Sequence, residues 1–323
     1  NIPLIKMEAV STKFLDMVYN TWVIQSSIGL TNQLLDNGEK PAVISAIMKQ
    51  QSTERARIVL NHAMDIHAGS SICLGYSNFL EKFYRSAPIG ITVEGSNTLT
   101  RNLIIFGQGL NKSHPFISDI LTDILNNDIQ SFTRNFNGIV GHSIEMYLKS
   151  IFNSLGTNTL ESQTIHFAHI SNLVALKGGS IKKEQQLSGD MADILSNLYL
   201  AYSVKWYEDN HNISQYLAKY CIQRLLDENV IVFNRIIDNY GVNGFLMKHI
   251  KKYPKSFNYK DNNKILKEIC NNDKIMKSIR EDIYVKDTIL EDLENLNNYD
   301  KESIEYKDLY NKIMTDFKIK NPE

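Results

Sequence analysis

Apolar residues recur every three or four positions along most of the chain, which is the period of an amphipathic α-helix. The first such run extends from Pro3 to about Leu35 and ends at the turn signal Asp36-Asn37-Gly38. A second run begins at Pro41, a residue type that suits the first turn of a helix, and continues to Ile66. Further helices are predicted over residues 116–124, 128–155, 160–176, 188–206 and 212–240.

These long periodic runs, joined by short loops, place the chain in the all-α class and favour antiparallel packing. The middle of the second helix, 50–57, is polar enough to face solvent or a partner on one side. Residues 67–85 carry Gly69 and Gly75 and are predicted to form a loop. Gly107-Gln-Gly109 is predicted to end a helix, and Gly178-Gly179 to cap another.

One stretch, 86–106, departs from the helical period. Ile89, Ile91 and Val93 alternate with smaller residues, which predicts an extended, half-buried segment. Gly95 is followed by three residues of types that favour the N-cap position, 96–98, which predicts the start of a new helix. Glu94 would lie at its start in apolar surroundings, either as an acid that complements the helix dipole or as a general base whose pKa is raised by burial.

Composition and charge argue against several classes of function. The 323 residues are 43% hydrophobic and 22% charged, as in ordinary globular proteins, and a net charge of -1 gives no overall field that would recruit nucleic acid. Cys73, Cys221 and Cys270 are too few and too dispersed for a disulfide framework or a cysteine zinc site. His62 and His67 lack a carboxylate at ligand spacing, so no metal site is predicted.

Four segments stand out in order along the first third of the chain: Gly38-Glu-Lys-Pro-Ala-Val-Ile-Ser-Ala-Ile-Met-Lys, Met64-Asp-Ile-His-Ala-Gly, Pro88-Ile-Gly-Ile-Thr-Val-Glu-Gly and Arg101-Asn-Leu-Ile-Ile-Phe-Gly-Gln-Gly. A second group follows: Leu176-Lys-Gly-Gly-Ser-Ile and Gly189-Asp-Met-Ala-Asp-Ile-Leu-Ser-Asn-Leu-Tyr-Leu-Ala. The first four segments resemble the C-terminal part of the acyl-CoA dehydrogenases of bacterial fatty-acid degradation, and the second group resembles the extra C-terminal helical region of these enzymes.

The resemblance implies an acyl-CoA dehydrogenase-like helical bundle over residues 1–126, a helical extension over 127–250 and a polar helical tail over 251–323. It also implies that Glu94 removes the α-proton of a fatty acyl-CoA while FAD accepts a hydride, and that the Glu94 N–H helps to polarise the thioester carbonyl. Ser96 and Thr98 match positions that touch the flavin after the catalytic residue.

Asp65, Ala68 and Gly69 match a loop that, in family dimers, meets the FAD of the neighbouring subunit. Ala68 stands where the first of two glycines is usual, and Asp65 where many relatives have Gln. The chain contains neither the N-terminal helical domain nor the β-barrel domain that hold the flavin in this family. We therefore expect a piece of a longer protein that binds FAD weakly or not at all by itself.

The partners implied by the resemblance are fatty acyl-CoA, an electron-transferring flavoprotein, the two missing domains and a second copy in a homo-oligomer. The implied location is cytoplasmic, with membrane association of the full-length protein left open. A different interpretation also stays open, in which the chain is a non-catalytic helical binding or assembly module derived from such an enzyme and Glu94 is only a helix-start acid.

Overall fold

The computed structural model describes residues 2–75, 78–255, 259–281, 283, 286 and 289–316, and every regular element in these ranges is helical, as predicted. Short 3-10 segments occupy Leu4–Lys6 (η1), Gly178–Lys182 (η3) and Val242–Ile250 (η4), and a π-helix, η2, occupies Thr100–Gln108. The α-helices are α1 Glu8–Asp36, α2 Ala42–His67, α3 Gly69–Ile72, α4 Leu80–Thr92, α5 Asn97–Leu99, α6 Gly109–Ser113, α7 Ile117–Leu125, α8 Ile129–Ser154, α9 Leu160–Ala175, α10 Gln185–His211, α11 Gln215–Asn239, α12 Tyr259–Asn271, α13 Asp273–Glu281, α14 Ile289–Asn298 and α15 Ile304–Asp316.

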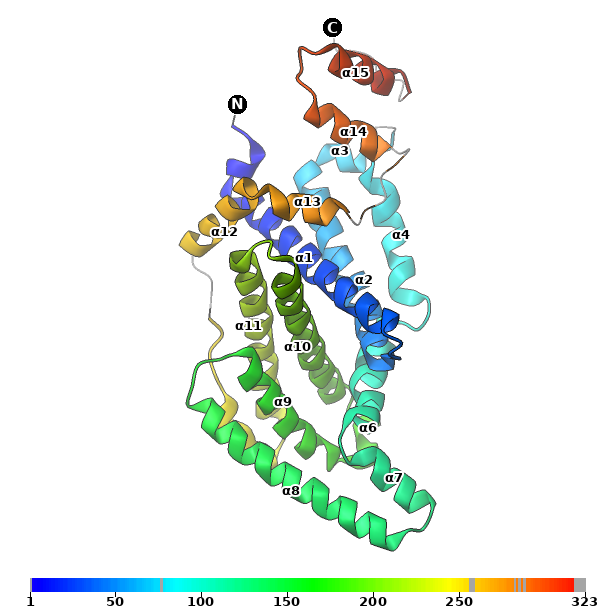
Figure 1. The fold of residues 1–323 in the computed structure, drawn as a ribbon, viewed down its shortest axis with the longest axis vertical. Helices are drawn as coiled ribbons and strands as arrows, with labels where there is room; N and C mark the ends of the chain where they lie inside the picture. The colour runs from blue at the N-terminus through cyan, green and yellow to red at the C-terminus, as the bar shows by residue number, and fades with distance from the viewer. Residues whose placement is uncertain are drawn as a thin grey trace.

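The helices form an elongated molecule with α1, α2, α10 and α11 at its centre (Figure 1). The start of α1 and the helices α14 and α15 lie toward one end, whereas α7 and α8 form the opposite end. The central position of α10 follows from its sequence, because small residues let neighbouring helices approach on several sides. Its fully buried side chains include Met191, Ala192, Ile194, Leu200, Ala201 and Val204.

A single hydrophobic core joins the beginning and the end of the chain. Trp22 of α1 is fully buried and packs edge-on against Tyr207 of α10, with 5.6 Å between the ring centroids. Ile265 and Ile275, from α12 and α13, belong to the same cluster of buried side chains. The polar C-terminal helices therefore contribute apolar faces to the core.

The extended segment predicted from Ile89, Ile91 and Val93 is wrong, because α4 continues to Thr92. Ile89 and Val93 are 59% and 50% exposed, so no half-buried strand face exists here. Instead, α4 packs closely on α2 at Gly90. A Cβ atom added to Gly90 would lie only 3.1 Å from Thr53 Cγ2 of α2. Tertiary contact with α2 has overridden the local preference for extended structure.

The loop predicted over 67–85 is also partly wrong, since it contains α3 and the start of α4; residues 76–77 lie outside the described residues. The helix end predicted at Gly107 and Gly109 does not occur, because η2 continues directly into α6. A Cβ at Gly109 would lie 3.3 Å from Val43 of α2, so this glycine serves close packing. Gly178 does follow a helix end, with a φ of 52°.

A buried polar cluster on Tyr19 links three of the central helices. The Tyr19 hydroxyl donates to Glu228 Oε1 of α11 at 2.8 Å, and the Arg224 guanidinium lies 3.9 Å from the centroid of its ring. Arg55 of α2 approaches the same ring at 5.4 Å. Arg224 also donates to Asp16 at 2.6 Å, and although burial alone would raise the pKa of Asp16, this cation lowers it.

A second ionic joint fixes η2 against α10. Arg101 donates two hydrogen bonds to Asp193, from Nε at 2.7 Å and from Nη2 at 2.6 Å. Arg235 of α11 makes a similar pair of bonds to Asp190, at 2.8 and 2.7 Å. Gly189 leaves room for this pairing, because a Cβ there would displace the Arg101 guanidinium. The 101–109 and 189–201 segments, noted separately in the sequence, are therefore in contact.

Three histidines gather where α8, α9 and η4 meet. Ser150 of α8 is fully buried, with its Oγ 2.9 Å from His166 Nδ1 and 2.8 Å from His249 Nε2. Burial lowers the pKa of His166 to about 3 and that of His169 to about 4. Both side chains are 2% exposed, so the folded state keeps them neutral.

These lowered pKa values predict a loss of stability in mild acid. The unfolded chain binds protons near pH 6.5, whereas folded His166 and His169 bind them only near pH 3 to 4. The free energy of unfolding should therefore fall as the pH drops from 6.5 to 4, by up to about 1.4 kcal/mol per pH unit for each histidine. Urea unfolding measured at several pH values would show this slope.

His166→Asn should make that slope shallower, because one of the buried groups with a lowered pKa is removed. His67→Asn, at an exposed histidine, is the matched control and should leave the slope unchanged. An equal pH dependence in His166→Asn and the unsubstituted chain would contradict the assignment.

Candidate functional site

Glu94 lies in a sharp turn between α4 and α5. Glu94 and Gly95 have φ angles of 54° and 91°, so two successive residues adopt left-handed conformations, and only the second is a glycine. Ser96 then caps the next helix, its Oγ accepting from the Leu99 N–H at 3.3 Å. The predicted helix start is confirmed, and Ser96 is its N-cap.

The turn is held against α2 by two side chains. Lys49 Nζ donates to the Gly95 carbonyl at 2.6 Å and to Asn97 Oδ1 at 2.7 Å. The Asn97 amide nitrogen, on a side chain that is only 6% exposed, donates to Thr53 Oγ1 at 2.9 Å and to Glu54 Oε1 at 2.8 Å. These four bonds fix the backbone around Glu94 relative to α2.

The Glu94 side chain is exposed, so the predicted burial in apolar surroundings is wrong for this chain. The prediction assumed a strand whose apolar face would cover the carboxylate, whereas the actual helix α4 ends before reaching it. Ser96 and Thr98 are exposed as well. All three side chains are therefore accessible to a molecule or domain that approaches from outside.

The other predicted residues lie at the C-terminal end of α2. Asp65 forms an ion pair with Lys13 of α1 at 2.6 Å, and this hydrogen bond lowers the pKa of Asp65. Ala68 has a φ of 48° and a ψ of -127°, a conformation that costs an L-residue free energy and that glycine adopts readily. Gly69 begins α3, and all three residues are exposed.

The structure does not bring the two predicted groups together. The Glu94 turn contacts α2 at Lys49 and Thr53, whereas Asp65 and Ala68 lie about 20 Å farther along the same helix at 1.5 Å per residue. None of the six predicted residues lines a cavity in the part of the chain that the structure describes. The predicted residues therefore form two separate exposed groups.

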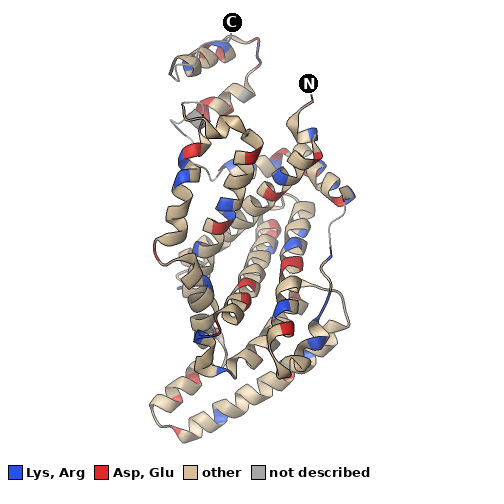
Figure 2. Cartoon of the chain, turned by 180° about the vertical axis from the view of Figure 1, so that it is seen from behind, with Lys and Arg blue, Asp and Glu red and all other residues tan. Residues whose placement is uncertain are grey.

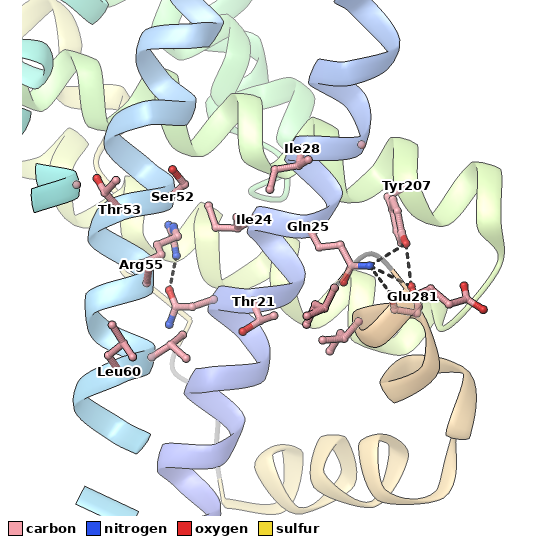
Figure 3. A pocket seen from close by; sticks show the side chains of 18 of the residues that line it. Thr21, Ile24, Gln25, Ile28, Ser52, Thr53, Arg55, Leu60, Tyr207 and Glu281 are labelled. Carbon is pink, nitrogen blue, oxygen red and sulfur yellow. Dashed lines mark hydrogen bonds between the residues drawn. The ribbon is translucent and has the colours of Figure 1, made fainter. Parts of the chain in front are cut away.

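A groove of about 1120 Å³ lies beside the Glu94 turn, between α1, α2, α4, α10 and α13 (Figure 3). Ile24 and Ile28 of α1 contribute apolar surface, and Gln25 crosses to the other wall, where its Nε2 donates to the Ser278 carbonyl at 2.6 Å. Tyr207 bonds Ser278 Oγ at 2.8 Å. Residues of α4 complete the lining: Phe83, Ser86, Ala87 and Gly90.

Sequence reasoning missed these α4 residues. Phe83, Ala87 and Gly90 are spaced four and three residues apart, as on one face of a helix. Phe83 was assigned to a predicted loop and the other two to a predicted extended segment, so this spacing was not recognised. Gly90 lines the groove one helical turn before Glu94, and Arg55 lines it from α2, with its Nη1 donating to Asn20 Oδ1 at 2.8 Å. The groove thus lies next to Glu94 without including it.

Residues 157–321 match the family described as "Acyl-CoA dehydrogenase, C-terminal, bacterial type", which is more than half of the chain. This chain belongs to that family. Residues 1–107 match a second description, "Acyl-CoA dehydrogenase, C-terminal domain". The resemblance drawn from the motifs is therefore confirmed, and the Glu94 turn falls within the second matched region.

A similar fold occurs in the crystal structure of an acyl-CoA dehydrogenase from Bacillus anthracis complexed with FAD, with a TM-score of 0.58 and 17% sequence identity. The similarity covers 84% of this chain and 50% of the other. The chain thus spans about half the length of that enzyme. In the part that the structure describes, no group of side chains could hold a metal ion, and no helix is long and apolar enough to cross a membrane.

The conformation of Ala68 generates a stability prediction. Ala68→Gly should raise the free energy of unfolding by about 1 kcal/mol, because glycine relieves the strained backbone at a φ of 48°. Chemical denaturation of the purified chain would measure the change. As a matched control, Ala42→Gly in the first turn of α2 should lower stability, since glycine disfavours helix. A loss of stability in Ala68→Gly would contradict the strain argument.

Proposed function

We propose that this chain is the C-terminal portion of a flavin-dependent dehydrogenase that oxidises fatty acyl-CoA to trans-2-enoyl-CoA, with Glu94 as the catalytic base. Family membership supports the reaction class. The observation that carries the proposal for Glu94 is its turn, where two left-handed residues are tied to α2 through Lys49 and Asn97. Such a conformation at a non-glycine residue is typical of functional sites.

The chemistry needs a carboxylate held at a fixed position. The α-C–H next to a thioester is a very weak acid, so its removal requires a base aligned with the proton and shielded from water. The bonds from Lys49 and Asn97 fix the backbone of the turn, and they leave the Glu94 carboxylate exposed to an incoming substrate. The Glu94 N–H would assist by donating to the thioester carbonyl.

FAD, when bound, supplies the acceptor for the hydride that leaves the β-carbon. Ser96 and Thr98 would contact it beside the catalytic turn, while Asp65, Ala68 and Gly69 would contact the FAD of a neighbouring subunit. These exposed residues fit contacts along an edge of the cofactor, and none of them lines either described cavity. In our proposal, the missing domains supply the rest of the flavin pocket, and an electron-transferring flavoprotein accepts the electrons.

The exposure of Glu94 favours the second candidate function, a helical assembly module without catalysis. In that case the turn only joins α4 to α5, and Glu94 acts as an acid near a helix start. The two functions differ in the role of the Glu94 carboxylate once the domains that precede this region in the family are present. It accepts a proton from the substrate in the first function and takes no part in catalysis in the second.

Glu94→Gln in a complete enzyme, assembled from this chain and the domains it lacks, tests the base directly. We expect enoyl-CoA formation to fall by about 100- to 10,000-fold, because glutamine cannot accept the proton. The flavin absorbance should be retained. Glu39→Gln, at an exposed glutamate between α1 and α2, is the control and should leave turnover unchanged. Full turnover in Glu94→Gln would assign the base to another residue.

The isolated chain should purify without bound flavin, because its candidate FAD contacts are exposed and separated along α2. The ratio of absorbance near the flavin band to protein absorbance, after incubation with FAD and gel filtration, measures this. Stoichiometric flavin on the chain alone would contradict the need for further domains.

A further inference from the structure

The α7–α8 hairpin is attached to the rest of the molecule with little buried surface, and the proposed function does not use it. Of the 26 residues of α8 only Ser150 is buried, and α7, all of which the structure describes, has no buried residue. Figure 1 shows α8 along the outside of the molecule beside α9, and Figure 2 shows few charged residues on it. The docking of the hairpin therefore depends on the few polar contacts of its inner face.

These contacts converge on Ser150. Its Oγ lies 2.9 Å from His166 Nδ1 of α9 and 2.8 Å from His249 Nε2 of η4. Tyr147, one helical turn earlier on α8, packs against His169 and His249, with ring centroids 5.2 and 5.8 Å apart. We call these five residues the Ser150 joint. Three imidazoles thus form the surface on which this part of α8 rests.

The joint accommodates neutral imidazoles but not charged ones. His169 Nε2 lies 3.4 Å from the Leu246 carbonyl oxygen and donates to it, so Nδ1 is the unprotonated nitrogen of the neutral ring. That Nδ1 and His166 Nε2 are buried and have no hydrogen-bond partner in the part of the chain that the structure describes. A proton added at either nitrogen would create a buried N–H without an acceptor, which is costly.

The groups around the joint also oppose protonation. Burial is the main cause that lowers the pKa of His166 to about 3 and that of His169 to about 4, and it lowers the pKa of His249 as well. Lys252 and the other two imidazoles lower the pKa of His166 further. On His169, the bond to the Leu246 carbonyl acts in the opposite direction and His249 in the same one. Among the described residues, no carboxylate acts on any of the three rings.

Carboxylates on the surrounding helices are paired elsewhere. Glu145 of α8 bonds Lys149 at 2.6 Å, and both side chains are more than half exposed. Asp238 of α11 pairs with Lys251, which follows η4. The element of α11 that faces the joint is the Phe233 ring, edge-on to His166 with 6.5 Å between the ring centroids. A protonated joint therefore gains no counter-charge from these helices.

The other half of α8 rests on a different contact. His142 lies edge-on to His114, with 5.7 Å between the ring centroids, and His114 Nε2 lies 2.8 Å from Asn172 Oδ1. Burial, His114 and Lys149 lower the pKa of His142, whereas Glu145 raises it. Because a carboxylate supports the cation here, the Ser150 joint is the more acid-sensitive of the two contacts.

We propose that the Ser150 joint is an acid-sensitive latch, which holds the α7–α8 hairpin on the molecule at neutral pH and releases it in acid while the central helices stay folded. In the docked state each added proton leaves a buried donor unsatisfied and adds to like charges, whereas water solvates the imidazolium groups of the released state. The central helices can remain together, because no residue of α7 or α8 belongs to the hydrophobic core.

The lowered pKa values set the direction and size of the effect. An imidazole with a pKa near 6.5 when released, and of 3 to 4 when docked, raises the opening constant up to about tenfold for each pH unit below 6.5. His166 and His169 together should raise it up to about 100-fold per pH unit, or about 1,000-fold between pH 6.5 and 5.

Hydrogen–deuterium exchange of the complete chain, followed by mass spectrometry from pH 7 to 4 and corrected for the intrinsic amide rate, tests the latch. A released α8 loses the packing that stabilises its helix, so its amides exchange. We expect residues 129–154 to lose protection with this pH dependence, and to exchange freely at a pH where residues 185–211 of α10 are still strongly protected. Loss of protection in both segments together would overturn the proposal.

Two kinds of variant separate titration from bond strength. His166→Asn combined with His169→Asn should remove most of the pH dependence of α8 exchange, whatever its protection at neutral pH. Ser150→Ala should raise the opening constant about tenfold at every pH and keep the pH dependence, because the imidazoles still titrate. Ser143→Ala, elsewhere on α8, is the matched control and should change neither.

Circular dichroism at pH 7 checks that every variant is folded. An unaltered pH dependence in the double histidine variant would overturn the latch. Equal α8 exchange in Ser150→Ala and Ser143→Ala would do so as well, and that comparison decides the question if the double variant does not fold.

Discussion

The buried contact between Tyr19 and the guanidinium groups of Arg55 and Arg224 is the constraint on which the rest of the structure depends. It brings two cations into an apolar interior, where each needs a carboxylate or a ring face as compensation. Glu228 and Asp16 supply the charges, and Tyr19 supplies both a ring and a hydroxyl. Since these groups come from α1, α2 and α11, none of the three helices can move without leaving a charge unpaired.

This contact also joins the two regions that match the family. Residues 1–107 provide Asp16, Tyr19 and Arg55, and residues 157–321 provide Arg224 and Glu228. The Arg101 bonds to Asp193 join the same two regions at a second place. The core of the first region therefore continues into the helical extension. The Glu94 turn is hydrogen-bonded to α2, and α2 packs against helices of both regions.

The sequence predicted correctly the helices in which the apolar period stops at the same place as a residue that favours a helix end. For α1, the apolar period and the turn at Gly38 both hold, and Gly38 has the φ of 83° that such a helix end requires. For α11, the period likewise ends before Gly241, which has a φ of 87°. The helix start at 96–98 was predicted because capping is a local interaction, here between the Ser96 hydroxyl and the Leu99 N–H. The family motifs located Glu94 and Arg101 but not their surroundings.

What the sequence could not show depends on contacts between distant residues. The polar stretch 50–57 was predicted to face solvent or a partner on one side; Arg57 is exposed, yet Gln50, Gln51 and Arg55 are buried. Gln51 donates to Gln50 and accepts from Arg55 within α2. Arg55 also donates to Asn20 of α1 and Asn197 of α10, and these distant partners are not revealed by any local pattern. In the same way, the packing of α4 on α2 at Gly90 and Thr53 joins residues far apart in the sequence, and Glu94, which follows the end of α4, is exposed.

The crossing at Gly189 has a consequence for how the chain can vary. A side chain at position 189 would displace the side chains of Arg101 and Asn102, and with them the two hydrogen bonds from Arg101 to Asp193, so this joint disfavours a change in the spacing between η2 and α10. Insertions and deletions in the intervening sequence must therefore be absorbed where the chain loops away from this joint. The α7–α8 hairpin, at the far end of the molecule, is the segment that can change length or surface while the turn bearing Glu94 keeps its place.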